Sequence, residues 1–183
     1  MLQRVTLDAY GLMFSARNTD YIQAIESSCI DNGNSTAFGH GSRFTIHDAA
    51  LINGTAIHGE DFDDTFEGTP VHVSSVIVPT ILAIAERKDV SPDTFIKSMA
   101  FGAELICRLA LVAPMAIHRQ GFHPTAILGA FGASLTASVA YGLSPQQTAS
   151  ALGIVGSMAS GIIEYLAEGM WTKRMHPGWA ASA

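Results

Sequence analysis

The stretch "PTAILGAFGASLTASVAYG" (residues 124–142) contains no charged residue and consists mainly of Ala, Gly, Ser and Thr. Its length is close to the roughly 20 apolar residues that a membrane-spanning helix needs. It holds only two Leu, one Ile and one Val, however, so it is less apolar than most membrane spans. We therefore predict a helix buried on all sides, whose small residues allow neighbouring helices to approach closely.

Serine–proline pairs indicate the start of a helix on each side of this stretch. Ser91–Pro92 opens "SPDTFIKSMAFGAELICRLALVA", and Ser144–Pro145 opens a helix that is predicted to reach about Gly156. In both pairs a serine suited to capping precedes a proline suited to the first helical position. The intervening "HRQGFH" (residues 118–123) is predicted to be a loop.

The first half of the chain also shows helical spacing of its apolar residues. Residues 31–44 are rich in Gly, Asn and Ser, which predicts a loop with room for a short strand at its end. The predicted helices cover Val5–Ala16, Asp20–Ile30, about 46–64, and Val73–Arg87 with a kink at Pro79.

No segment alternates between apolar and polar residues over a sustained length, so the fold class is all-α. With 183 residues, of which 48% are hydrophobic, the chain is long enough for a sizeable core. We predict a multi-helix bundle that forms a single domain over residues 1–183.

Composition excludes several classes of partner. The net charge is −6 and the basic residues are scattered, so neither nucleic acid nor an anionic membrane is an expected partner. Only Cys29 and Cys107 are present, without CxxC spacing, which favours a reducing cytoplasm over a disulfide framework. Asp8 interrupts the apolar run at the N-terminus, and this argues against a signal peptide.

The stretch "HGEDFDDT" (residues 58–65) concentrates acids in a chain of which only 14% is charged. If the helix continues through it, His58, Asp61 and Thr65 share one face. Asp63 would then point elsewhere, about 200° around the axis from Asp61. The alternative interpretation is a solvated helix end, which we expect for Glu60.

Other polar residues are candidates for chemistry. His72 lies at a loop-to-helix junction, His123 directly precedes Pro124, and "MWTKRMHPGW" gathers Lys173, Arg174 and His176. A metal site formed by His58, Asp61 and His72 is disfavoured, because such spacings are common by chance. "DFDDT" also matches a terpene-cyclase motif, but a chain with 8% aromatic residues suits that class poorly.

Four segments resemble successive blocks of the MmgE/PrpD family. They are "DAALINGTAIHGEDFDDT", "HVSSVIVPTILAIAE", "GFHPTAILGAFGASLTASVAYGLSPQQTASALGIVGSMASGI" and "GMWTKRMHPGWAA". The family includes 2-methylcitrate dehydratase, cis-aconitate decarboxylase and iminodisuccinate epimerase. The resemblance implies a large helical domain with a smaller α+β lid domain, of which this chain covers only the helical part, and a homodimer.

The resemblance also implies functional residues. Catalytic roles fall on Asp61, His72, His123 and Lys173, although "EGTPV" departs from the family by a one-residue insertion before His72. Thr65 matches a further pocket residue. His58, Arg174 and His176 are expected to bind substrate. The lysine and tyrosine that the family draws from its lid have no counterpart here.

The implied activity is cofactor-independent acid–base chemistry beside a carboxylate of a small di- or tricarboxylate, without a metal. A positioned base and cations that bind the developing dianion suit such a reaction. We expect a hydro-lyase resembling 2-methylcitrate dehydratase, with an epimerase or decarboxylase as alternatives. The alternative outside the enzymes is a truncated helical domain that does not catalyse a reaction.

Overall fold

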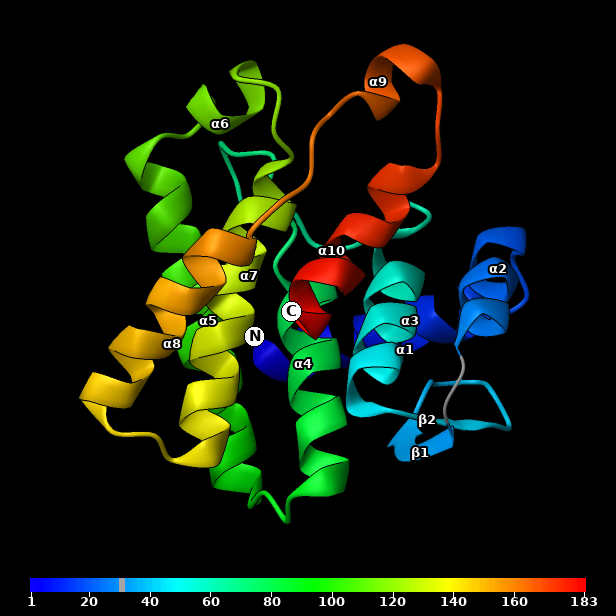
Figure 1. The fold of residues 1–183 in the computed structure, drawn as a ribbon, viewed down its shortest axis with the longest axis vertical. Coiled ribbons are helices and arrows are strands. Elements are labelled where there is room, and N and C mark those ends of the chain that lie inside the picture. The colour runs from blue at the N-terminus through cyan, green and yellow to red at the C-terminus, as the bar shows by residue number, and fades with distance from the viewer. Residues whose placement is uncertain (30–31) are drawn as a thin grey trace.

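The computed structural model describes residues 1–29 and 32–183, which form ten helices and one small antiparallel sheet (Figure 1). The all-α prediction is confirmed. The helices are α1 Leu2–Ala16, α2 Asp20–Ser28, α3 Ile46–His58, α4 Ser74–Arg87, α5 Pro92–Val112, α6 Ala116–Arg119, α7 Pro124–Tyr141, α8 Pro145–Met158, α9 Tyr165–Glu168 and α10 Thr172–Ser182. The sheet pairs β1 Asn32–Thr36 with β2 Arg43–Phe44.

Helix α7 is the buried helix that its small residues predict. No residue from Pro124 to Ala140 is exposed. A side chain at Gly132 would overlap Ile106 of α5, and one at Gly129 would overlap Val76 of α4. The small residues therefore let both α4 and α5 pack closely against α7 (Figure 1).

The two serine–proline starts are also confirmed. The Ser91 hydroxyl accepts a hydrogen bond from the Thr94 amide, and Ser144 forms a reciprocal capping box with Gln147. Helix α4 keeps Pro79 inside one continuous helix despite its many β-branched residues. Burial of those residues outweighs their weak helix propensity, because α4 lies at the centre of the core (Figure 1).

Helix α10 packs across α3, α4 and α7, and this contact brings the end of the chain to the core (Figure 1). Its closest approach to α3 is at two glycines. A β-carbon on Gly178 would lie 2.2 Å from the Leu51 carbonyl oxygen, and one on Gly54 would lie 2.6 Å from the Gly178 α-carbon. Only glycine fits at this crossing.

Replacing Gly178 with alanine should therefore destabilise the protein by about 1–3 kcal/mol or more, because backbone atoms must move apart. The free energy of unfolding is measured by denaturant titration. Gly153→Ala is the matched control: Gly153 is an exposed helical glycine with open space around it, so its replacement should stabilise by roughly 0.5–1 kcal/mol. Equal stability of the Gly178 variant and wild type would contradict the close crossing.

Several predicted boundaries were wrong. The helix predicted over 46–64 ends at His58, because Asp61 adopts a left-handed conformation (φ 61°) and its amide bonds back to the His58 carbonyl. The 118–123 loop begins inside the short helix α6, and the C-terminal end of the predicted 20–30 helix lies outside the described residues. The short strand expected at the end of residues 31–44 is confirmed as β2, whereas β1 lies in the part that was expected to be a loop.

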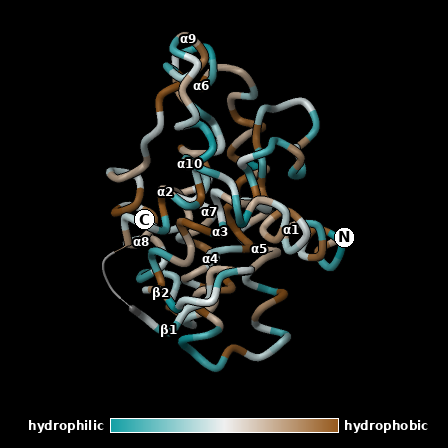
Figure 2. The backbone as a smooth tube through the Cα atoms, turned by 90° about the vertical axis from the view of Figure 1, so that its right-hand side faces the viewer, coloured by the Kyte–Doolittle hydropathy of each residue, from teal (hydrophilic) through white to brown (hydrophobic). Residues whose placement is uncertain are grey.

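Across the described ranges, none of the helices combines the length and the apolarity needed to cross a bilayer. The hydropathy view in Figure 2 and the ribbon in Figure 1 both place α6 and α9 at the same end of the molecule. The segments that precede α7 and α9 are joined there by a bridge between Phe122 and Ile162 and by a bond from the His123 amide to the Gly161 carbonyl. These bonds fix the wall of a pocket.

Candidate active site

A pocket of about 340 Å³ opens at this end of the molecule. It is lined by Asp61, Thr65, Pro70, His72, His118, His123, Tyr165, Leu166 and Lys173. The lining therefore combines side chains from the α3–α4 loop, α6, α9, α10 and the start of α7. Its volume suits a small ligand.

The α3–α4 loop is held on both sides of His72. The His72 amide donates to the Thr125 hydroxyl on α7 (3.1 Å), and the Phe66 amide donates to the Val71 carbonyl (2.9 Å). The Asp64 carboxylate accepts a hydrogen bond from the Ser74 amide at the start of α4 (3.0 Å). Because its backbone is tied to two helices, this loop can present side chains at fixed positions.

Asp63 lies behind the pocket, between two imidazoles. Its carboxylate is 3.0 Å from Nδ1 of His58 and 3.2 Å from Nδ1 of His72. The side chains of Asp63 and His58 are fully buried, whereas that of His72 is 12% exposed and reaches the pocket. The prediction that Asp63 points away from His58 was wrong, because the helix on which it was based ends before Asp63.

Asp61 and Lys173 form an ion pair in the pocket. The Asp61 carboxylate is also 3.9 Å from Nε2 of His72, so these three charged or titratable groups face one another. Burial alone would raise the pKa of Asp61, but the hydrogen bond and the charge of Lys173 outweigh it and lower that pKa. The pocket therefore contains an ionised carboxylate beside an ammonium group.

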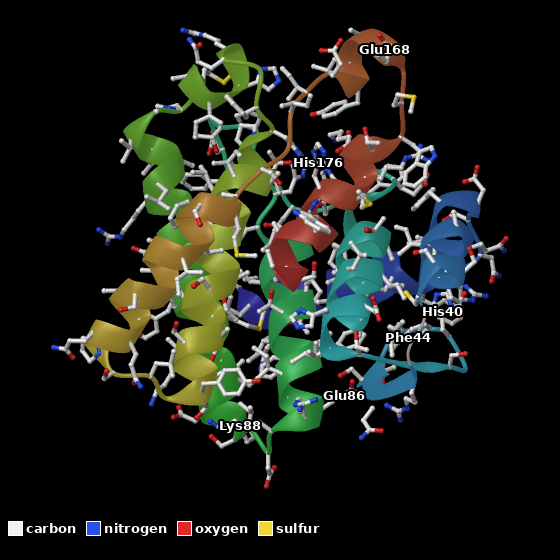
Figure 3. All side chains as sticks on the ribbon, viewed as in Figure 1. His40, Phe44, Glu86, Lys88, Glu168 and His176 are labelled. Atoms are coloured by element: carbon white, nitrogen blue, oxygen red, sulfur yellow. The ribbon has the colours of Figure 1, made fainter. Side chains whose placement is uncertain are left out.

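His123, which lines the pocket, forms a second imidazole pair with His176, which does not line it. Nδ1 of His123 is 3.2 Å from Nδ1 of His176, and the Tyr165 ring packs edge-on against both imidazoles. Figure 3 shows His176 on α10 at the end of the molecule where α6 and α9 lie. His123 is the residue before α7, where Pro124 cannot donate a backbone hydrogen bond.

The histidines differ in their protonation. Burial lowers the pKa of His123 to about 2, with help from the neighbouring His58 and His176. Burial also lowers the pKa of His58, against the opposing effect of Asp63. For His72, burial is outweighed by the hydrogen bond to Asp63, so the pKa is raised. Of these three imidazoles, His72 is the one whose surroundings favour the protonated form.

The predicted residues fall into two groups. Asp61, Thr65, His72, His123 and Lys173 line the pocket. The other three do not line it. His58 contacts Asp63, His176 contacts His123, and the guanidinium of Arg174 lies 4.7 Å from the centre of the Tyr21 ring. Sequence reasoning missed Asp63, His118 and Tyr165, of which only Asp63 had a signal, namely its place in "DFDDT".

Donor atoms of His58, Asp61, Asp63 and His72 lie within 4.8 Å of one another, which is close enough for a metal ion to bridge. Each carboxylate already has protein partners, however, because Asp63 bonds both imidazoles and Asp61 bonds Lys173. An ion would have to displace these bonds and approach the Lys173 ammonium. We therefore assign no metal to the cluster.

A larger cavity of about 390 Å³ lies between α4, α7, α8 and the end of α10. Its walls are mainly apolar, and none of the predicted site residues borders it. The chemistry is therefore assigned to the smaller pocket, where an ammonium, a carboxylate and three imidazoles converge.

Titratable side chains that converge on one pocket of a helical domain suit acid–base chemistry. The sequence profile described as the MmgE/PrpD N-terminal domain matches residues 1–183. The chain is thus a member of the MmgE/PrpD family, and the expected resemblance is confirmed.

Three relatives that match this chain are named for cis-aconitate decarboxylation. The chain is 33% identical to human cis-aconitate decarboxylase over 188 residues, covering 98% of this chain and 38% of the relative. It is 32% identical to the cis-aconitate decarboxylase-like protein oryM of Aspergillus oryzae, and the match covers 81% of this chain and 32% of that relative. The Aspergillus terreus cis-aconitate decarboxylase is 28% identical, and the match covers 88% of this chain and 34% of that relative. The chain spans about one third of the length of these relatives.

Proposed function

We propose that this domain supplies the proton-transfer and carboxylate-binding part of a lyase active site for a small tricarboxylate. The observation that carries the proposal is the convergence of Lys173, the titrating His72 and the neutral His123 on one pocket. Family membership and relatives named as decarboxylases, which are lyases, support it. The scheme requires no cofactor.

The chemistry explains why a cation and a proton carrier are needed together. When CO₂ leaves a carbon near a second carboxylate, the electron pair of the broken C–C bond is delocalised toward that carboxylate. Lys173 would bind the extra negative charge more strongly in the transition state than in the ground state. Protonated His72 would then deliver its proton to carbon, so each turnover consumes one proton.

We assign different tasks to His72 and His123, two of the three imidazoles that line the pocket. His72 gains and loses the proton, because its pKa is raised from 6.5. His123 has a pKa of about 2 and stays neutral at working pH, so it contributes a hydrogen bond rather than a charge. This assignment specifies which histidine acts as acid or base.

Loss of CO₂ is our first candidate because the matched relatives are named cis-aconitate decarboxylases. Loss of water, which the sequence led us to expect, would use the same residues, but His72 would first accept a proton instead of donating one. Neutral His72 would remove a proton beside the carboxylate, and the hydroxyl group would leave as water after protonation. The two reactions therefore need opposite protonation states of His72.

The test uses the protein expressed from its complete reading frame, with cis-aconitate, 2-methylcitrate and iminodisuccinate as separate substrates. We expect release of CO₂ from cis-aconitate. Turnover of 2-methylcitrate without CO₂ would replace the decarboxylase proposal with the dehydratase one. Absence of turnover with all three would contradict a lyase of this family type.

The pH dependence gives an independent prediction. If His72 is the acid, kcat/KM for CO₂ release should fall as pH rises through the pKa of His72, above its usual 6.5. The sign follows because only the protonated imidazole can donate. An increase of kcat/KM over the same pH range would instead identify neutral His72 as the base. Rates at constant ionic strength provide the measurement.

A further inference from the structure

Asp63 is a buried carboxylate that does not line the pocket, yet it contacts the imidazole that does. Its oxygens are 3.0 Å from Nδ1 of His58 and 3.2 Å from Nδ1 of His72. The two hydrogen bonds outweigh burial and lower the pKa of Asp63, so the carboxylate is ionised. An ionised carboxylate only accepts hydrogen bonds, and therefore both Nδ1 atoms must carry protons.

We propose that Asp63 is the positioning residue of this site: it holds the Nδ1 protons of His58 and His72 and so directs Nε2 of His72 into the pocket. The observed direction of Nε2 agrees, since this atom is 3.9 Å from the Asp61 carboxylate in the pocket. The effect of Asp63 on turnover rests on the proposed function, whereas its contacts with His58 and His72 do not.

The second imidazole has a role of its own. Asp63 has one negative charge to share between two histidines, and like charges on both would repel. His58 is completely buried and remains a neutral donor, while the partly exposed His72 can become protonated. His58 thus holds the buried carboxylate in place and leaves its charge available to His72.

Other groups also act on the titration of His72. Asp61 faces it from the same loop and favours its protonated form, whereas Lys173 of α10 disfavours that form. The titratable side chains that share the pocket are His118, His123, Tyr165, Asp61 and Lys173. Asp63 is distinguished from all of these by its direct bond to Nδ1 of His72.

The variant that tests the proposal is Asp63→Asn. The amide oxygen can accept from one imidazole only, and the amide NH₂ group opposes the other. We expect the pKa of His72, measured by NMR with ¹⁵N-labelled histidine, to fall by about one unit or more. The descending limb of the rate profile should move to lower pH by the same amount, and kcat at neutral pH should fall about tenfold.

Asp64→Asn is the matched control. It removes a charge at the next residue but keeps an oxygen for the Ser74 amide, so neither the pKa of His72 nor kcat should change. In a His72→Gln background, Asp63→Asn should cause no additional loss of kcat, because a positioning residue acts through His72. A further loss in that background would show a separate role and overturn the proposal.

The wild-type protein gives a test that does not depend on folding of a variant. Long-range ¹H–¹⁵N spectra should show the Nδ1–H tautomer for neutral His58 and His72 in the complete protein. An Nε2–H tautomer at either residue, or an unchanged pKa of His72 in Asp63→Asn, would overturn the proposal. If no substrate is turned over, the proposed function fails, yet the tautomers still decide whether Asp63 positions both rings.

Discussion

Replacing His72 with glutamine should lower kcat for CO₂ release from cis-aconitate by about 10²- to 10⁴-fold, the usual contribution of a positioned acid or base. Glutamine retains hydrogen-bonding capacity but cannot carry the proton. Steady-state rates at several pH values provide the measurement. The fall in rate with rising pH that we assign to His72 in the wild-type protein should disappear as well.

The control is His40→Gln. His40 also pairs with a carboxylate, that of Glu26 at 3.1 Å, but it is not part of the pocket lining. Its replacement should leave kcat unchanged. Equal losses in both variants would show that disrupting any imidazole–carboxylate pair impairs this protein, and the specific role of His72 would be withdrawn.

Replacing Lys173 with methionine should lower kcat by about 10²- to 10³-fold, as expected for loss of one key contact to developing negative charge. Methionine preserves much of the length and apolar stem while removing the ammonium. KM should also rise, because Asp61 then faces the anionic substrate without its partner. Initial rates over a range of cis-aconitate concentrations separate the two effects.

Two further variants sharpen this test. Lys97→Met removes an exposed lysine of α5, whose partner is Asp93, and should leave both kinetic constants unchanged. Adding Asp61→Asn to Lys173→Met should bring the raised KM part of the way back to the wild-type value, because the repulsion between Asp61 and the anionic substrate is relieved. It should not restore kcat, because the cation remains absent. Full recovery of kcat in the double variant would contradict the role of Lys173 in the transition state.

The ion pair between Asp61 and Lys173 also bears on how substrate enters. Asp61 is 59% exposed, and Lys173 is 26% exposed, so solvent weakens their attraction. An incoming carboxylate can therefore compete with Asp61 for the ammonium. Asp61 would hold Lys173 in the empty pocket and then share it with the substrate.

Local sequence determined most of the helices. The serine–proline pairs at Ser91 and Ser144 specify two starts, because a hydroxyl cap and a fixed proline φ act within a single turn. The small residues of 124–142 specified a buried helix, because only close neighbours suit such side chains. The resemblance of four segments to the family could likewise be read from the sequence, and it implied five residues that line the pocket.

Only the tertiary structure decided which side chains the Asp61 and Asp63 carboxylates contact. Helical periodicity placed Asp61 beside His58 and turned Asp63 away, but the chain leaves the helix after His58. The left-handed Asp61 then directs its own carboxylate to Lys173, 112 residues later in the chain, while Asp63 turns inward between two histidines. A periodic pattern predicts neighbours only while the helix lasts. Beyond its end, the partners are set by packing of α3, α4 and α10, which involves residues far apart in sequence.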